Sequence, residues 1–394
     1  MVNLKYHVNE LRTKLTHLNI QVRLELERPV MSHIISHTLQ NIEPLDMAAM
    51  AAVRERQARL TKPAGSLGRL EELSIKVAGI TGKSMPHLDR KAIIVMAGDH
   101  GVAAEGVSAY PAEVTPQMVQ NFLNGGAAIN VFARQTGARV VIADLGVAVD
   151  LPGHPQLVNR KIGYGTRNIA HGPAMTLVEA RAAVEAGIQI VQAEIQKGLD
   201  IIGTGDMGIA NTTPSSAIVA ALTGQEVERV TGRGTGIDGQ GWERKVATIK
   251  QALEINRPDP ENALDVLAKV GGFEIAGLVG LIFGAAAGRI PVVIDGFIST
   301  AAALVATEWH PPVRDYLIAA HNSVEIGHRV MLERMELVPL LNLDLRLGEG
   351  TGAALAMPLI EAACLALREM ATFNEAGVSE REENPVETGR KLQK

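Results

Sequence analysis

Cysteine, aromatic side chains and long apolar runs are all scarce in this 394-residue sequence. Its single cysteine, Cys364, excludes an internal disulfide, and the apolar residues around it predict a buried helical thiol rather than a nucleophile. Aromatic residues make up only 3% of the chain while alanine and glycine are abundant, which favours a layered α/β fold over an all-β sandwich. The longest apolar run, residues 275–288, is too short and too rich in glycine to span a membrane, so it predicts a buried helix.

Targeting signals and dense runs of one charge are also missing. The net charge is -5 and no dense run of Lys and Arg occurs, which argues against a nucleic-acid-binding surface. The N-terminal segment carries charges where a signal peptide needs an apolar core, so we expect a cytoplasmic protein that does not contact a membrane. No Walker A string occurs, which argues against an ATP-driven enzyme.

Short apolar runs alternate with helix-like segments through the middle of the chain. Runs that end in Gly or Asp fit strands buried on both faces of a parallel sheet, and they occupy 92–98, 139–146, 199–205 and 291–297. Helices are expected at 115–136, 176–197, 215–223, 242–255, 273–288, 323–336 and 354–373. This alternation predicts an α/β, Rossmann-like fold with a mostly parallel sheet and helices on both faces. Its ligands should gather at the carboxyl ends of the strands.

The most informative single residue is Glu349, a lone carboxylate between Gly348 and Gly350 in the string RLGEGTG. Glycine on both sides lets the backbone and a ligand approach closely. Burial in such a place raises the pKa of a carboxyl group toward the working pH of a general base. The alternative is that the acid caps the helix that starts near Thr351, and the local string favours neither interpretation.

A G-x-G-x-x-G pattern spans residues 203–208 directly after a predicted strand. It makes a nicotinamide-dinucleotide-dependent oxidoreductase the alternative function. The pattern is not in the first strand–helix unit, however, and it continues as the polar string NTTP. Hydroxyls and free backbone N–H groups in such a turn suit a single phosphate at a helix N-terminus. The string therefore favours a mononucleotide phosphate over a dinucleotide, while a tight strand–helix turn without a ligand is comparably compatible with it.

Two further motifs are weaker. A second glycine-rich loop at 232–236 precedes Lys245, which could supply a point charge for phosphate, although a solvated helix lysine is the commoner state. Asp99 and His100 follow the first predicted strand in the string AGDHG. With no partner at metal-ligand spacing, the pair predicts structural capping rather than a metal site.

Taken together, six strings resemble the nicotinate-nucleotide:dimethylbenzimidazole phosphoribosyltransferase family. They are TKPAGSLGRLEEL, VMAGDHGVAAEGVSAYP, GTGDMGIANTTPSS, KVGGFEIAGLVG, VVIDGFI and LRLGEGTGAALAMP, in order from about residue 42 to about residue 375. The resemblance implies transfer of the phosphoribosyl group from nicotinate mononucleotide to dimethylbenzimidazole. The products are α-ribazole phosphate and nicotinate, in the synthesis of the lower ligand of cobalamin. It also implies a homodimer that needs no metal or redox cofactor.

The resemblance further implies a division of the chain into domains. It places a large Rossmann-like catalytic domain at 89–351 and a small helical domain at 46–88 together with 352–378. Residues 1–45 are then an N-terminal extension, in which Met31 is a second candidate start. The polar residues 379–394 are expected to be a disordered tail.

The family's functional residues carry over onto the matching strings of this sequence. The general base falls on Glu349, and the serine near the nicotinate carboxylate falls on Ser323. The phosphate loop includes Gly205, Gly208, Asn211 and Thr212, with Lys245 as the phosphate lysine. Tyr110, Met118 and Met207 surround the aromatic ring of the acceptor base. Many members have glutamate where this chain has Asp206, which we assign to the catalytic group without a defined role.

Overall fold

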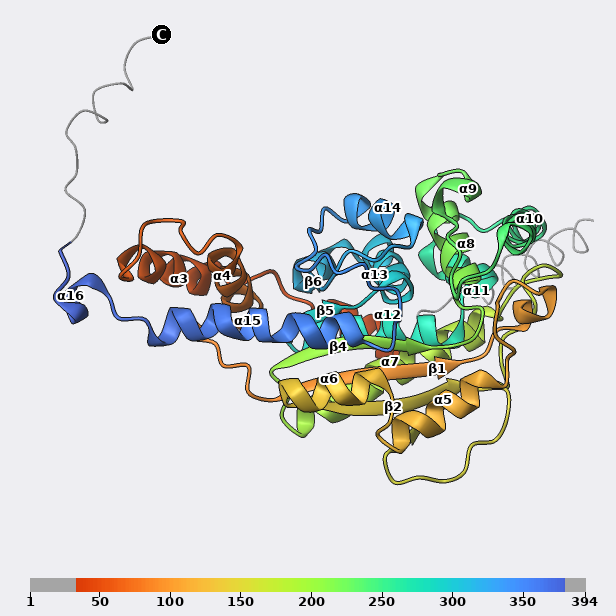
Figure 1. Ribbon diagram of the computed structural model, residues 1–394, viewed down its shortest axis with the longest axis horizontal. Coiled ribbons are helices and arrows are strands. Elements are labelled where there is room, and N and C mark those ends of the chain that lie inside the picture. The colour runs from red at the N-terminus through yellow and green to blue at the C-terminus, as the bar shows by residue number, and fades with distance from the viewer. Residues whose placement is uncertain (1–32, 380–394) are drawn as a thin grey trace, which may run out of the picture.

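Six parallel strands form one sheet in the middle of the molecule (Figure 1). The computed structural model describes residues 33–379, and the strand order across the sheet is β3-β2-β1-β4-β5-β6. The strands are β1 (Lys91–Gly98), β2 (Ala138–Gly146), β3 (Leu157–Asn159), β4 (Ile201–Met207), β5 (Val292–Ile294) and β6 (Leu317–Ala319). The strand order reverses at β1, which has β2 on one side and β4 on the other. Ligands of open α/β sheets bind outside the carboxyl ends of the strands near such a reversal.

Strand β1 shows why both faces of the sheet are covered. All of its residues are buried, and successive side chains point to opposite faces. Ile94 and Met96 belong to one apolar core, and Ile93 and Val95 belong to another. A continuous apolar run is what a strand covered on both faces requires. The predicted α/β fold with a parallel sheet and helices on both faces is therefore confirmed.

The helices divide between these two faces. One face carries α2 (His33–Gln40), α7 (Leu177–Gln196), α12 (Phe273–Ala287) and α13 (Phe297–Trp309). The other carries α5 (Val114–Leu123), α6 (Ala128–Thr136) and α15 (Thr351–Glu369). The remaining elements are α3 (Met47–Arg59), α4 (Arg69–Thr81), η1 (Gly101–Glu105), α8 (Thr212–Thr223), α9 (Val227–Val230), α10 (Gly239–Asn256), α11 (Ala263–Val270), η2 (Pro311–Tyr316), α14 (Ile326–Arg334) and α16 (Phe373–Ala376).

Some expected elements differ from the observed ones. The single helix expected at 115–136 is wrong, because α5 ends before Gly125, whose φ of 75° lies in the left-handed region, and α6 begins after it. The strand expected at 291–297 is shorter than predicted, since helix α13 already begins at Phe297. The sequence pattern did not predict β3 and β6, each of which is three residues long, or the helices α11 and α13.

Helices from the two ends of the chain pack against each other. Helices α3 and α4 lie along the C-terminal part of α15, where Ala49, Val53, Ala78 and Leu367 form a small apolar core (Figure 1). Helix α15 is long and apolar enough to cross a membrane, but 56% of that stretch is buried inside the fold, as in a core helix.

Helix α2 falls within the predicted N-terminal extension. It packs against α7 and α12, and its Ile35 is fully buried. The expectations for residues 1–32, including Met31, and for 380–394 of the predicted tail lie outside the described residues.

Candidate active site

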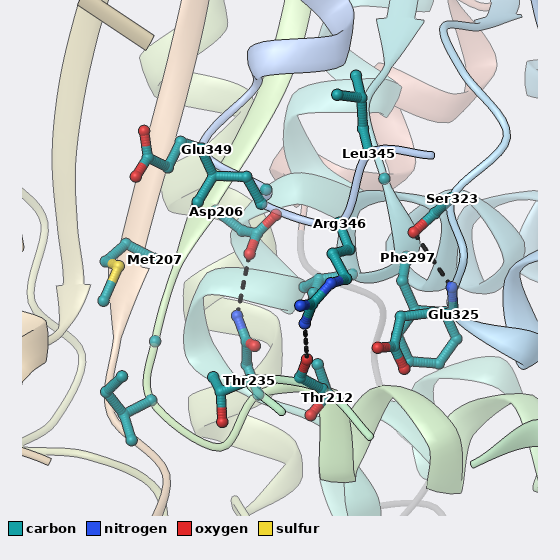
Figure 2. A pocket seen from close by; sticks show the side chains of 18 of the residues that line it. Asp206, Met207, Thr212, Thr235, Phe297, Ser323, Glu325, Leu345, Arg346 and Glu349 are labelled. Carbon is teal, nitrogen blue, oxygen red and sulfur yellow. Dashed lines mark hydrogen bonds between the residues drawn. The ribbon is translucent and has the colours of Figure 1, made fainter. Parts of the chain in front are cut away.

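A cavity of about 710 Å³ opens at the carboxyl ends of β4, β5 and β6. Strand β4 delivers Asp206 and Met207, and the turn after it delivers Gly208, Asn211 and Thr212. The rest of the lining comes from segments that lie far apart in the sequence, namely 110–118, 234–235, 296–298, 321–325 and 344–349. Figure 2 shows Glu349 and Met207 on one side of this cavity and Ser323, Glu325 and Phe297 on the other.

Glu349 lies in a strained turn at the edge of the cavity. Gly348, Glu349 and Gly350 have φ angles of 80°, 62° and 90°, so all three are in the left-handed region. The Glu349 side chain is 6% exposed, and its Oε2 accepts the backbone N–H of Ile129 at 3.3 Å. Burial raises the pKa of Glu349, the Ile129 N–H opposes that rise, and the charge of Asp295 adds to it. A carboxylate that lines a cavity with a raised pKa is suited to general-base chemistry.

The capping interpretation of Glu349 is wrong. The N-cap residue of helix α15 is Gly350, which has no side chain to cap the helix. The Glu349 carboxylate accepts the N–H of Ile129 in α6 instead. The carboxylate that serves α15 is that of Asp295, which accepts the N–H groups of Gly350 and Ala353.

The G-x-G-x-x-G string does not form a dinucleotide turn. Gly203 and Gly205 lie inside strand β4, where they pair with Ile93 and Val95 of β1. A Cβ on Gly205 would lie 2.6 Å from the carbonyl oxygen of Glu349. Glycine is needed there because the Glu349 turn packs directly on the strand. Gly205 does not line the cavity, whereas Gly208 does.

Asp206 is a buried acid on the same side of the cavity as Glu349 (Figure 2). Its Oδ2 accepts the side-chain N–H of Asn211 at 3.0 Å, while its Oδ1 has no hydrogen-bond partner among the described residues. Burial raises the pKa of Asp206 well above its usual value, and the nearby carboxylates of Asp295 and Glu274 add to that rise. The surroundings of this side chain thus favour its protonated form more than water does.

The N-terminus of α8 and the buried Lys245 form a site suited to an anion. The Lys245 Nζ donates to Thr212 Oγ1 at 2.6 Å, and Thr212 is the first residue of α8. Lys245 itself is fully buried behind Thr212. Burial lowers the pKa of Lys245 to about 8, and the charge of Glu325 partly opposes this. An anion beside Thr212 would supply a compensating charge close to this buried ammonium group.

Ser323 lies across the cavity from Glu349 (Figure 2). Its backbone N–H donates to His328 Nδ1 at 2.8 Å, and its Oγ accepts the backbone N–H of Glu325 at 3.4 Å. Burial lowers the pKa of His328 to about 3, so the ring is neutral and its Nδ1 can accept this bond. These bonds fix the orientation of the segment that carries the serine.

Apolar side chains form the wall next to Glu349. Tyr110, Met118 and Met207 all line the cavity, together with Val114 and Ile209. Tyr110 is 56% exposed at the mouth, while Met118 and Met207 are half-buried. Methionine is flexible and polarizable and packs well on aromatic faces, so this wall is suited to a flat aromatic molecule.

Several residues that line or support the cavity were not predicted from the sequence. Arg346 lines the cavity and donates from Nη1 to the carbonyl oxygen of Gly234 at 3.3 Å. Its position three residues before Glu349 could have identified it as a site residue. Thr235, Phe297 and Glu325 also line the cavity. Asp295 supports the Glu349 turn from the end of β5. Apart from the position of Arg346 close to Glu349, nothing local in the sequence distinguishes these residues, because only the topology brings them to one place.

The other sequence candidates lie outside the cavity. His100 Nε2 lies 2.7 Å from Glu274 Oε1 in a buried pair, and Asp99 Oδ2 accepts the N–H of Ala148. Within residues 33–379, no group of three or more His, Cys, Asp or Glu side chains is arranged to hold a metal ion. Cys364 is buried in α15, as predicted, and burial raises the pKa of its thiol to about 12.

Comparisons with known proteins agree on one group of relatives. A family model described as phosphoribosyltransferase matches residues 42–378. A nicotinate-nucleotide–dimethylbenzimidazole phosphoribosyltransferase of Roseiflexus sp. strain RS-1 is 62% identical over 351 residues, which cover 89% of this chain and 99% of the relative. The enzyme of the same name from Geobacter sulfurreducens is 57% identical over 347 residues, covering 88% and 99%. The crystal structure of such an enzyme from Thermus thermophilus superposes with a TM-score of 0.81 at 48% identity, covering 86% of this chain and 100% of that one.

Proposed function

Because the chain belongs to the nicotinate-nucleotide–dimethylbenzimidazole phosphoribosyltransferase family, we propose that it catalyses the reaction after which these relatives are named. It transfers the phosphoribosyl group of nicotinate mononucleotide to dimethylbenzimidazole and releases nicotinate and α-ribazole phosphate. The observation that supports this most strongly is a single cavity with an anion site at Thr212 and Lys245, an apolar wall, and the buried carboxylate of Glu349 beside that wall. The oxidoreductase alternative lacks support from the relatives, and all of its glycine pattern except Gly208 lies within strand β4.

In the proposed reaction, the substrates occupy opposite sides of one ribose. The phosphate of the mononucleotide binds at the N-terminus of α8 near Thr212, with Lys245 behind it. The benzimidazole packs against Tyr110, Met118 and Met207, and the nicotinate lies toward Ser323. The cavity has to hold two flat rings and a ribose in the correct orientation. Such positioning accelerates the reaction because the reacting atoms no longer need to meet by diffusion.

Proton transfer requires one base. Nicotinate leaves from a positively charged pyridinium glycoside, so its departure needs little acid assistance. One nitrogen of the benzimidazole attacks the anomeric carbon from the opposite face, which converts a β-glycoside into an α-product. The other nitrogen loses its proton to the carboxylate of Glu349, whose pKa is raised by burial.

The same proposal covers assembly and location. The protein acts as a homodimer in the cytoplasm on small-molecule substrates, without nucleic acid or membrane partners. Its large domain extends over 89–351, and the small helical domain combines 46–88 with 352–378. Sedimentation of the purified protein measures the oligomeric state directly, and a monomer at working concentration would contradict the dimer.

The decisive experiment combines binding and turnover. Calorimetry with nicotinate mononucleotide and with nicotinamide adenine dinucleotide should show binding of the former and weak binding of the latter. Adding dimethylbenzimidazole to the enzyme and the mononucleotide should release nicotinate, which chromatography quantifies. Tight dinucleotide binding would support the oxidoreductase instead. Mononucleotide binding without nicotinate release would indicate a nucleotide-binding regulator.

A further inference from the structure

The hydroxyl of Thr235 joins two loops that both contribute to the cavity lining. Thr235 lies between α9 and α10 and lines the cavity together with Gly234. Its Oγ1 accepts the backbone N–H of Ala109 at 3.0 Å and lies 3.4 Å from the hydroxyl of Ser108. These residues are about 126 positions away in the sequence and directly precede Tyr110, which is part of the apolar wall. Thr235 therefore holds the loop that carries Tyr110, whereas Met118 and Met207 belong to α5 and β4.

The residue before Thr235 contacts the anion site. A Cβ on Gly234 would lie 2.7 Å from Thr212 Oγ1 and 3.2 Å from Lys245 Nζ, so the Gly234 backbone covers both groups. Gly234 has a φ of 52°, which glycine adopts without strain. Its carbonyl oxygen also accepts from Arg346. Two consecutive residues thus contact the anion site and the loop that carries Tyr110, one each.

From this arrangement we propose that Thr235 is a positioning residue that couples the binding of the two substrates. The inference rests on the proposed function, which assigns the phosphate to the Thr212–Lys245 side and the aromatic base to the Tyr110 side. A phosphate beside Gly234 orders the loop that carries Thr235, and Thr235 then holds the Tyr110 wall in place for the base. The first ligand to bind bears part of the entropy cost of ordering the two loops, so the second ligand binds more tightly. The effect is the same whichever ligand binds first.

The hydrogen bond between Thr235 and Ala109 can be removed by substitution without damaging the core, which allows its role to be tested. It is exposed to solvent, so water can replace the hydroxyl as the acceptor for the Ala109 N–H. Valine has nearly the shape of threonine but lacks the hydroxyl, and serine keeps the hydroxyl. Thr235→Val and Thr235→Ser therefore separate the hydrogen bond from the packing. Thr81→Val is the matched control, because the Thr81 hydroxyl bonds only to Val77 of the distant helix α4 among the contacts described.

Ribose 5-phosphate is the probe for the phosphate side, since it carries the phosphate and ribose but has no nicotinate to lose. Calorimetry measures the affinity for dimethylbenzimidazole with and without saturating ribose 5-phosphate. We expect the sugar phosphate to tighten base binding by about 5-fold or more in the native protein, the lower end of usual coupling factors. Thr235→Val should reduce this factor to near one. Thr235→Ser and Thr81→Val should keep it.

Turnover separates this inference from the proposed function. Thr235→Val should raise the KM for dimethylbenzimidazole several-fold more than it lowers kcat, because the base wall is held less firmly. If the native protein releases nicotinate but shows no coupling, or if Thr235→Val couples as strongly as the native protein, the role of Thr235 is refuted while the activity stands. If the native protein releases no nicotinate with any benzimidazole, the proposed function itself fails, and the assignment of the two sides fails with it.

Discussion

The carboxylate of Asp295 accepts the backbone N–H of Gly350 at 3.1 Å, one residue after Glu349. Its other oxygen accepts the N–H of Ala353 at 3.0 Å, so a single fully buried acid holds both the Glu349 turn and the first turn of α15. A negative charge at a helix N-terminus is favourable because it faces unpaired N–H groups. The same charge contributes to raising the pKa of Glu349.

Replacing Asp295 with asparagine should therefore alter the pH profile of the enzyme. Asparagine offers one acceptor oxygen instead of two and no charge, so Asp295→Asn should lower the free energy of unfolding by about 1–3 kcal/mol. Loss of the nearby charge should also lower the pKa of Glu349 and shift the acidic limb of kcat/KM to lower pH. Asp315→Asn, at an exposed position, serves as the control. An acidic limb that stays in place would show that Asp295 does not influence the base.

Glu349→Gln should fold normally and lose most of its turnover. Glutamine keeps the size of the side chain and an oxygen that can accept the Ile129 N–H, but it cannot take a proton from the base. A positioned general base contributes about 10²–10⁴-fold to rate, which sets the expected loss in kcat. Nicotinate release with dimethylbenzimidazole measures it, beside Glu333→Gln on the exposed face of α14. Near-native turnover would remove Glu349 as the base.

Asp206→Asn should affect turnover much less than Glu349→Gln does. Burial and neighbouring acids raise the pKa of Asp206 and so favour its protonated form, which asparagine resembles in shape and charge. We expect kcat/KM to stay within about tenfold of the native value, less than a general base contributes. Steady-state kinetics at pH 7 with nicotinate mononucleotide checks this. A loss as large as that of Glu349→Gln would mean that Asp206 acts as a carboxylate.

Binding of the mononucleotide should weaken as the pH rises above 8. The pKa of Lys245 in the free protein is about 8, so above that pH its side chain becomes a neutral amine. The phosphate stays a dianion from pH 7 upward. Lys245→Met should bind the mononucleotide weakly at every pH. Calorimetry between pH 6.5 and 9.5 measures the effect, with the exposed Lys250→Met on the same helix as control. A pH-independent affinity in the native protein would contradict the role of Lys245.

The lowered pKa of Lys245 also predicts how the free energy of unfolding changes with pH. Because the pKa of Lys245 is below the value of 10.5 expected in the unfolded chain, the unfolded state binds the proton more tightly. The contribution of Lys245 to the free energy of unfolding therefore increases as the pH rises from about 8 to 10.5. Comparing native protein with Lys245→Met by urea unfolding across this range isolates the contribution, and the opposite slope would contradict it.

The acceptor preference follows from the apolar wall. The methyl groups of dimethylbenzimidazole should be buried against Met118 and Met207, at about 0.8 kcal/mol per buried carbon, or roughly tenfold for the pair. We therefore expect dimethylbenzimidazole to be preferred over benzimidazole and phenol to be used poorly. Competition assays with mixed bases measure the ratios. Indifference to the methyl groups would refute the assignment of the wall but not the transferase activity.

The long strands and the position of Glu349 could be predicted because each depends on a local pattern. Strands buried on both faces give continuous apolar runs, as at 92–98, and a carboxylate flanked by glycines is visible in any window that contains it. Strands β3 and β6 are too short for a periodic signal. The role of Asp295 depends on a hydrogen bond to a residue 55 positions away, which only the folded sheet creates. The roles of the predicted site residues remain predictions until the variants are measured.

Helix α15 is held by opposite charges at its two ends. Asp295 binds its N-terminus beside Glu349, and at the far end Arg56 of α3 donates to the carbonyl oxygens of Leu367 and Met370. The nineteen residues of α15 make a helix about 28 Å long, with Pro358 in its interior. A substitution that loosens α3 would thus free the far end of α15 and allow the turn that carries Glu349, the proposed base, to move. Turnover would then depend mechanically on residues that never approach a substrate.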